Sequence, residues 1–527
     1  MVGTARRWTR VGASVVVLAL AVTACSSGGG KGSSGTPAAS SGKADPNGVL
    51  QVGYDLVQEG ATKVFGDPAE AENNAGANDS LYYLVFGRFM KQNDDGTLTP
   101  DLATSATIVD NNTIQVVLRD GLKFSDGTAL DAAAAKVALE RNLTAKNQVP
   151  FRPAFASLKS IDVVNPTTLK LSIPDGTAPG WFDTYISSWQ VSLAKPGATP
   201  DSPIGAGPMT IESYERHQTL SLKKSPTYWD AAHVKVAGMK FTHTSAAQVS
   251  SGMSALRSGQ IDVVTTDPSQ LAAVTGKLAT FKRVSPTQNL WITWCKREGP
   301  LANAKVRVAL NKAIDRKAIN DTLYKGTGEP STQLWPKGHK FADPSLDNFL
   351  AYDPPAAKKL LAEAGFDKGF SVDIYPVEAS GIEETMAVMK QEFAAIGVTL
   401  NIKSGGNFVN DFLVPNAPGM GIFPGDSKGV EKLDDFVGTS LGNVCDYSDP
   451  AMTELRNEIA KTSQNDPKAV ELWRKAEKMV VEQGLDGFVL FRSLLAAYDS
   501  TRVGGMSSLF LGQFITPDPT KTYVKAS

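Results

Sequence analysis

Histidine and cysteine, the residue types that most often serve metal sites and nucleophilic chemistry, are few in this chain and widely spaced. No two histidines stand at an i, i+4 spacing and no cysteine lies near one, so the spacing predicts no metal site; the four are His217, His233, His243 and His339. Residues 93–96 lack the remaining ligands of a calcium loop. The chain has no phosphate-binding loop of the G-x-x-x-x-G-K-[ST] type. We therefore expect neither catalysis nor a bound metal or cofactor.

One cysteine, Cys25, follows a segment that is typical of an export signal. Three arginines in the first ten residues precede an apolar run over 11–21, which is shorter than the roughly 20 residues needed to span a bilayer. This pattern predicts a secretory signal peptide over 1–24. Thr23-Ala24-Cys25 resembles a bacterial lipobox, in which the cysteine thiol is acylated. We expect a protein anchored by lipid on the extracytoplasmic face of the cell membrane; a plain signal peptide with an unmodified Cys25 is the alternative.

Composition separates a tether from a folded body. After Cys25, the stretch up to residue 47 is rich in Ser and Gly and has almost nothing apolar to bury, which predicts a flexible linker over 25–47. The whole chain of 527 residues is 42% hydrophobic and 20% charged, an ordinary globular balance. Its 53 basic and 54 acidic side chains give a net charge of -1, which argues against nucleic acid as a partner.

Hydrophobic periodicity predicts a mixed α/β body, with strands at 48–54, 220–222, 261–264, 398–402 and 487–491 and hairpins over 103–118 and 161–171. Helices are predicted over 131–142, 246–258, 305–323, 383–396, 452–460 and 467–481, together with one that follows Asp353. Asp131 and Asp353 are expected N-caps, and Gly365 is an expected C′ residue. Asp315 and Arg316 are expected near the end of the helix over 305–323.

Several sequence blocks resemble the large extracytoplasmic solute-binding proteins of peptide-type ABC importers, known as solute-binding family 5. The blocks stand in the family's order, and VRVALNKAIDR is the most specific of them. They are PDLA (100–103), LRDGLKFSDGT (118–128), PIGAGP (203–208), SPTYW (225–229), LRSGQID (256–262), VRVALNKAIDR (306–316) and LLAEAGF (360–366).

This resemblance implies a periplasmic-binding-protein-like II fold, an α/β fold with two lobes, three domains and a two-stranded hinge. The implied domains are domain I (48–73, 200–290 and 488–527), domain II (74–199) and domain III (291–487). The hinge crossings fall at 289–294 and 485–491. Lobes joined in this way are expected to close around a ligand.

The same resemblance implies a substrate-binding protein that captures an oligopeptide between its lobes and delivers it to the permease subunits of an ABC importer. Other solutes remain open, namely a sugar, an amine or a metal complex. A ligand-sensing surface lipoprotein is a further alternative. A secreted hydrolase would need a nucleophile–base pair that the sequence does not show.

Site residues follow from the resemblance. Asp426, preceded by Gly425, stands where peptide-binding relatives hold the ligand's ammonium group; a surface turn is the other interpretation. Relatives that bind dipeptides place an arginine near 376–380, where this chain has Glu378 and no arginine. A longer peptide, a cationic solute or an uncharged solute therefore stays open.

The aromatic candidates for ligand contact are Tyr54, Trp291, Trp294 and Trp335, with burial in the core as the alternative for each. Cys295 and Cys445 are the remaining cysteines, both in the implied domain III of an exported protein. We expect a disulfide between them; two buried free thiols are the alternative.

Overall fold

The computed structural model describes most of the chain beyond residue 41. The described residues are 42–56, 79–93, 97–144, 157–197, 203–245, 249–377, 379, 381–413, 417–426, 429–437, 442–509 and 514–526. The predicted signal peptide, Cys25 and the tether up to residue 41 lie outside these ranges.

The last residues of the predicted tether are held by the other end of the chain. The amide of Asp45 donates to the carbonyl of Val524 at 2.8 Å, and the amide of Ala526 donates to the carbonyl of Lys43 at 2.9 Å. Ala44 forms an antiparallel bridge with Lys525. Residues 43–45, at the end of the predicted linker, are therefore paired with the backbone of the C-terminus.

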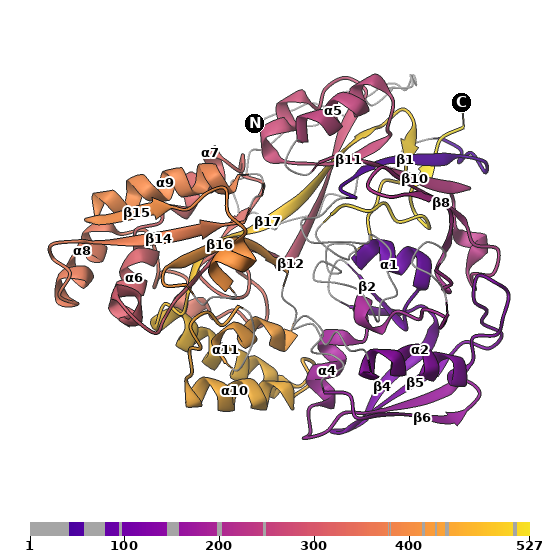
Figure 1. The fold of residues 1–527 in the computed structure, drawn as a ribbon, viewed down its shortest axis with the longest axis horizontal. Coiled ribbons are helices and arrows are strands. Elements are labelled where there is room, and N and C mark those ends of the chain that lie inside the picture. The colour runs from indigo at the N-terminus through magenta and orange to yellow at the C-terminus, as the bar shows by residue number, and fades with distance from the viewer. Residues whose placement is uncertain are drawn as a thin grey trace, which may run out of the picture. The chain divides into compact units, whose positions relative to one another are not determined.

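A mixed sheet of eleven strands organises the described residues (Figure 1). Its order is β15-β14-β16-β12-β17-β11-β1-β10-β9-β8, and β13 also pairs with β17. The strands are β1 (Val49–Tyr54), β8 (Met209–Glu215), β9 (Thr219–Lys224), β10 (Gly238–His243), β11 (Val263–Thr266), β12 (Leu278–Trp294), β13 (Glu329–Pro330), β14 (Phe370–Pro376), β15 (Val398–Ile402), β16 (Met420–Asp426) and β17 (Asp486–Asp499).

Two strands of this sheet, β12 and β17, are much longer than the rest, with 17 and 14 residues. They pair with each other antiparallel at both ends, but the register shifts between Val284 and Asn289. The segments predicted to cross between lobes lie within or next to these strands. The long pair therefore connects β15, β14 and β16, which precede β12 in the order, with the strands from β11 to β8 that follow β17.

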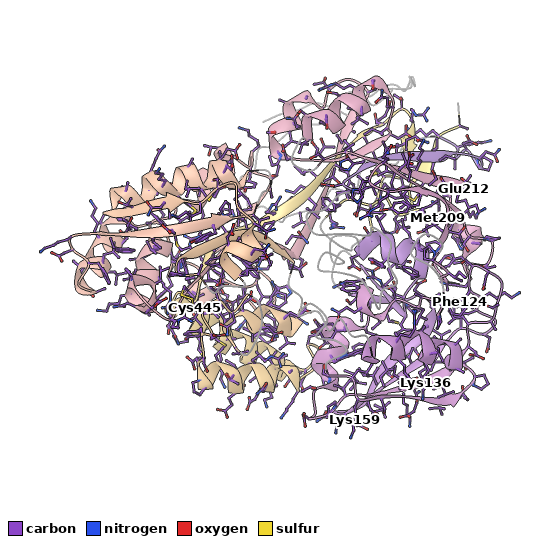
Figure 2. All side chains as sticks on the ribbon, in the orientation of Figure 1. Phe124, Lys136, Lys159, Met209, Glu212 and Cys445 are labelled. Atoms are coloured by element: carbon purple, nitrogen blue, oxygen red, sulfur yellow. A yellow bond between two sulfur atoms is a disulfide. The ribbon has the colours of Figure 1, made fainter. Side chains whose placement is uncertain are left out.

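A second sheet has the order β4-β5-β7-β6 and is built from two antiparallel hairpins, as the sequence predicted. Phe124, labelled in Figure 2, is buried in the core beneath it. Its strands and the helices whose residues share that core are β4 (Ala103–Asp110), β5 (Thr113–Leu118), β6 (Ser160–Asn165), β7 (Thr168–Ser172), α2 (Ala132–Thr144) and α4 (Ala178–Tyr185).

The other helices are α1 (Asp79–Phe86), α5 (Val249–Ser258), α6 (Ala304–Lys312), α7 (Arg316–Thr322), α8 (Pro354–Glu363), α9 (Ile382–Ala395), α10 (Pro450–Ala460) and α11 (Pro467–Glu482). Short strand pairs are β2 (Met90–Gln92) with β3 (Leu98–Pro100), and β18 (Val503–Gly504) with β19 (Tyr523–Val524). Short 3-10 or π-helical segments are η1 (Trp189–Val191), η2 (Ala231–His233), η3 (Pro268–Ala273), η4 (Pro300–Ala302), η5 (Pro344–Leu346), η6 (Val409–Leu413) and η7 (Gly429–Phe436). Among the helices described, none has the length and apolar character to cross a membrane.

The hydrophobic core is divided into separate clusters, and β17 contributes to several of them. Leu494 and Ala496 lie in the cluster of β1 and β10, whereas Leu490 lies in the cluster of α6 and α9. Phe488 joins a third cluster, which is built on α10 and α11. One continuous strand therefore enters cores that are otherwise distinct.

Local capping signals placed several helix ends correctly. Asp131 accepts a hydrogen bond from the amide of Ala134 at 2.8 Å, and Asp353 accepts one from Ala356 at 2.9 Å. Gly365 has φ +86°, the left-handed conformation expected of a C′ glycine. Each of these ends is fixed by residues within four positions of it, which is why sequence alone locates it.

The predicted single helix over 305–323 is wrong. The chain forms α6 and α7 with a break between them, and Asp315 caps the start of α7 by accepting from the amide of Ala318 at 2.9 Å. Arg316 is therefore a first-turn residue and not a cation at a helix end. Its guanidinium is buried and donates to backbone carbonyls. These tertiary contacts break the helix although the hydrophobic periodicity continues through it.

Gly205 and Gly207 are required by close packing. A Cβ at Gly205 would lie 2.3 Å from the carbonyl oxygen of Val85, and one at Gly207 would lie 2.3 Å from that of Leu84. Gly205 and Gly207, both described by the structure, do not have positive φ angles. The glycines of the PIGAGP block thus allow the close approach of the backbone of α1.

Candidate functional site

Strand β12 presents two different faces where it pairs with β16. Leu290, Ile292 and Trp294 point into the core of α6 and α9. Because side chains alternate along a strand, Asn289 and Trp291 lie on the opposite face. We call this second surface, made by Asn289, Trp291, Phe423 and Gly425, the junction face.

The indole of Trp291 lies over Gly425 on the neighbouring strand. A Cβ at Gly425 would be 2.8 Å from Cζ2 and 3.4 Å from Nε1 of Trp291. Trp291 also meets Phe423 edge to face, with the ring centroids 5.9 Å apart. Gly425 is therefore needed for the position of the indole, which a larger residue would displace.

Two polar groups of the junction face have no hydrogen-bond partner among the described residues. They are Nε1 of Trp291, whose residue is 2% exposed, and Oδ1 of Asn289, whose residue is 4% exposed. Gly425 is the direct cross-strand partner of Asn289, so both groups lie next to the same glycine. Buried polar atoms are nearly always satisfied, which marks this pair as a place where a ligand could bind.

Aromatic residues and a disulfide flank the junction face. Phe408 contacts both Phe423 and Phe412, at centroid distances of 5.4 and 5.5 Å. Cys295 and Cys445, the latter labelled in Figure 2, form the disulfide that the sequence led us to expect, with their Cα atoms 5.2 Å apart. The bond joins the end of β12 to the segment before α10 and closes a sequence separation of 150 residues.

Two aromatic residues predicted to contact ligand lie in hydrophobic cores. Tyr54 is packed edge-on against Phe241, and its burial raises its pKa to about 12. Trp294 is fully buried and donates its Nε1 hydrogen to the carbonyl of Gly484 at 2.9 Å. These placements match the core alternative for both residues.

The other candidates from the sequence are Trp335, Asp426 and Glu378. Trp335 is stacked on His339 at a centroid distance of 4.3 Å and meets Trp473 edge to face at 5.2 Å, so it too packs with other rings. The backbone of Asp426 ends β16 opposite Gln288. The side chain of Asp426 and the whole of Glu378 lie outside the described residues.

Residues of the VRVALNKAIDR block form hydrogen bonds with the backbone at the start of β17 and just before it. Arg307 donates to the carbonyls of Gln483 and Gly484 at 2.9 and 3.1 Å. Arg316 donates to the carbonyl of Phe488 at 2.8 Å, and the side chain of Asn311 accepts from the amide of the same residue at 3.2 Å. Sequence reasoning missed this role, since the partners are more than 170 residues away.

Asp101 of the PDLA block joins two further blocks. It accepts from the hydroxyl of Tyr228 at 2.9 Å and from Nε1 of Trp229 at 3.0 Å. The guanidinium of Arg119 lies 3.5 Å from the centroid of Trp229. Burial raises the pKa of Asp101, and these bonds lower it in part. These contacts thus join three of the sequence blocks, and their role is structural.

Helix α4 lies directly against the end of α10. A Cβ at Gly180 would lie 2.7 Å from the carbonyl oxygen of Ala460. The carboxylate of Asp183 accepts a hydrogen bond from the amide of Gln464 at 2.6 Å, and Lys340 donates to the carbonyl of Gln464 at 2.9 Å. We call this meeting point the α4 contact. Burial raises the pKa of Asp183 to about 6 against the opposing effect of the bonds from Gln464.

Buried charges beside the disulfide belong to the scaffold. Lys296 donates to the carbonyls of Trp294 and Leu485 at 3.4 Å each, and burial lowers its pKa to about 8 while Asp486 opposes that shift. Burial likewise raises the pKa of Asp486. Within the described residues, no group of three or more His, Cys, Asp or Glu side chains could hold a metal ion.

Comparison with known proteins identifies the family. Residues 97–418 match the bacterial extracellular solute-binding proteins, family 5 (middle). This match spans more than half of the chain, so the protein belongs to the bacterial extracellular solute-binding proteins of family 5, as the sequence blocks predicted.

Curated relatives include the glutathione-binding protein GsiB of Salmonella paratyphi A, which is 27% identical over 341 residues. GsiB of Escherichia coli O157:H7 is 26% identical over the same length. Each alignment covers 62% of this chain and 65% of the relative. The chain therefore spans just under two thirds of the length of these relatives.

Solved structures share the fold. The ABC transporter substrate-binding protein CtaP from Listeria monocytogenes has a TM-score of 0.77 at 22% identity, with 91% of this chain and all of CtaP covered. NikA from Staphylococcus aureus, in complex with Ni(L-His)2, has a TM-score of 0.73 at 18% identity, with coverage of 91% and 100%. The Escherichia coli murein tripeptide binding protein MppA gives 0.74 at 18% identity, with coverage of 92% and 100%. The likeness shows the two-lobed periplasmic-binding-protein-like fold.

Proposed function

We propose that this protein is the extracytoplasmic substrate-binding protein of an ABC importer. It captures an oligopeptide between its two lobes and passes it to the permease subunits. The observation on which the proposal depends is the long pair β12 and β17 in a family 5 chain, because β17 enters several separate cores. A connection of two strands allows two rigid bodies to close around one axis.

The three domains are proposed with the boundaries expected from the sequence, at 48–73 plus 200–290 plus 488–527, at 74–199 and at 291–487. With these boundaries, the α4 contact joins domain II to domain III. Asp183 and Gly180 on one side and Gln464 and Ala460 on the other then meet when the lobes close. Differential contacts of this kind are what a closed state requires.

An oligopeptide is the proposed solute because two of the similar proteins are named for peptides, namely a glutathione-binding protein and a murein tripeptide binding protein. Asp426 is proposed to bind the ammonium group of the peptide, with Gly425 and Trp291 beside it. Acylation of Cys25 is proposed to keep the protein at the outer face of the cell membrane, since lipid chains of this kind anchor firmly when several are present.

Native mass spectrometry of the protein purified without denaturation tests the function. We expect bound peptides that can be released by acid and sequenced. Recovery of only a sugar, an amine or a metal complex would reject the peptide assignment while keeping the binding role. A failure to bind any member of a synthetic tri- to hexapeptide library in titration calorimetry would also reject it.

The anchor has its own test. Cys25→Ser should move the protein from the membrane fraction to the medium and leave the calorimetric affinity for a captured peptide unchanged, because Cys25 precedes the folded body. A protein that stays in the membrane fraction would contradict the proposed acylation.

A further inference from the structure

We propose that Asn289 and Trp291 bind one uncharged peptide bond of the captured solute. The indole Nε1–H donates to the carbonyl oxygen of that bond, and Oδ1 of Asn289 accepts from its N–H. This inference rests on the proposed function and adds to it the chemical group that the junction face recognises.

The first ground is burial without a partner. Both residues are at least 96% buried, and among the described residues neither Nε1 of Trp291 nor Oδ1 of Asn289 has a hydrogen-bond partner. By contrast, Trp294 in the same strand is equally buried and is satisfied by the carbonyl of Gly484. The fold pairs the indole on the core face and leaves the indole on the junction face unpaired. A ligand that supplies the missing groups recovers free energy on binding, because the desolvation has already occurred.

The second ground is proximity. Asn289 and Gly425 are direct partners in the antiparallel register of β12 and β16, and partners of this kind have Cβ positions about 5 Å apart. Nε1 of Trp291 lies 3.4 Å from the Cβ position of Gly425. The unpaired donor and the unpaired acceptor therefore lie beside one glycine, whose missing side chain admits the indole to this position.

The third ground is the chemistry of the two groups. An indole is a donor only, and an asparagine side chain offers an acceptor and a donor. A secondary amide presents the complementary acceptor and donor within one planar group. The rings and backbone around the pair, from Phe423 and Gly425, carry no charge. A carboxylate placed here would be buried without a counter-ion, which is strongly unfavourable.

The fourth ground is selectivity. Because every peptide bond offers the same donor and acceptor, this pair would bind the main chain of a peptide whatever its side chains. The half-buried ring of Phe423 beside it gives an apolar surface to the groups that flank the bond. The junction face thus recognises the main chain of a peptide without fixing the sequence of the peptide.

The test uses a synthetic library of tri- to hexapeptides and the full chain. A captured peptide is synthesised again with each amide in turn replaced by an ester, which removes one N–H. For the natural protein, we expect one ester to weaken binding about tenfold in titration calorimetry, the effect of one lost hydrogen bond. Asn289→Leu should abolish that difference between amide and ester. Trp294→Phe, the matched control on the core face, should keep it.

The outcomes separate this inference from the proposed function. Capture of peptides with the same ester effect in Asn289→Leu as in the natural protein overturns the inference alone. Capture of no peptide overturns both proposals. If Asn289→Leu does not fold, Trp291→Phe decides the matter. It keeps an aromatic ring, and it should lose about tenfold in affinity for the amide peptide; an unchanged affinity overturns the inference.

Discussion

Replacing Asp183 by asparagine should change how the stability of this protein depends on pH. Asp183 accepts the amide of Gln464 at 2.6 Å, and its burial raises its pKa from 3.8 to about 6. Lys340 is the charged group that opposes this shift. Between these two pKa values the native state holds a proton that the unfolded state releases. The contribution of Asp183 to stability is therefore present at low pH and is lost as pH rises through 6.

The magnitude follows from the size of the shift. A change of about two pKa units corresponds to roughly 3 kcal/mol between pH 4 and pH 7. Asp183 is partly exposed, and solvent screening reduces this to about 1–2 kcal/mol. Asp183→Asn keeps an oxygen that accepts from Gln464 but cannot ionise. At pH 7 the variant should therefore be about 1–2 kcal/mol more stable than the natural protein, and the two should be nearly equal near pH 4.5.

Urea unfolding followed by tryptophan fluorescence at pH 4.5, 6 and 8 measures this difference. Other carboxyl groups with raised pKa values, such as Glu392 and Glu477, titrate in both proteins and cancel in the comparison. Asp183→Ala is the matched variant that also removes the acceptor, and it should be less stable than Asp183→Asn at every pH. The same pH profile for Asp183→Asn and the natural protein would refute the reasoning.

Four further predictions concern the scaffold. Reduction of Cys295–Cys445, which closes 150 residues, should lower the free energy of unfolding by about 2–4 kcal/mol; an unchanged urea midpoint with reductant would contradict it. Gly205→Ala places a Cβ 2.3 Å from a carbonyl oxygen of α1 and should cost about 1–3 kcal/mol in the same assay. Arg316→Met leaves several buried carbonyls unpaired, so a loss of about 3 kcal/mol is expected in urea unfolding. Burial raises the pKa of Glu477 from 4.5 to about 8, so the natural protein loses stability as pH rises from 4.5 to 8, because the native state keeps a proton that the unfolded state releases; Glu477→Gln should therefore raise the thermal midpoint more at pH 8 than at pH 5.

Sequence reasoning succeeded where a structural feature depends on neighbouring residues. The caps Asp131 and Asp353 bond amides three residues away. The hairpins follow from alternation and a short turn. The break between α6 and α7 was missed because Arg316 is fixed by Phe488, a partner 172 residues distant. Periodicity within the segment contains no information about that contact.

The site was predicted in part, and one available signal was overlooked. Leu290 and Ile292 are apolar and alternate with Asn289 and Trp291, so a strand assignment places Trp294 on the same face as Leu290 and Ile292. That alternation predicts Trp294 in the core and Trp291 on the other face. The missing hydrogen-bond partners of Asn289 and Trp291 could not be predicted, because they depend on what the rest of the fold does not supply.

The residues through which the chain resembles its family act mainly on the scaffold. Asp101 binds Tyr228 and Trp229, and Arg307 and Arg316 hold the backbone where β17 begins. The partners in these bonds are other residues of the chain, so the blocks stabilise the fold. For this reason the fold can be identified from their sequence. The junction face lies outside the blocks, between residues 289 and 425. We therefore expect the solute to be recognised by groups that the scaffold leaves unpaired, and the comparison of amide and ester peptides at Asn289 and Trp291 measures this directly.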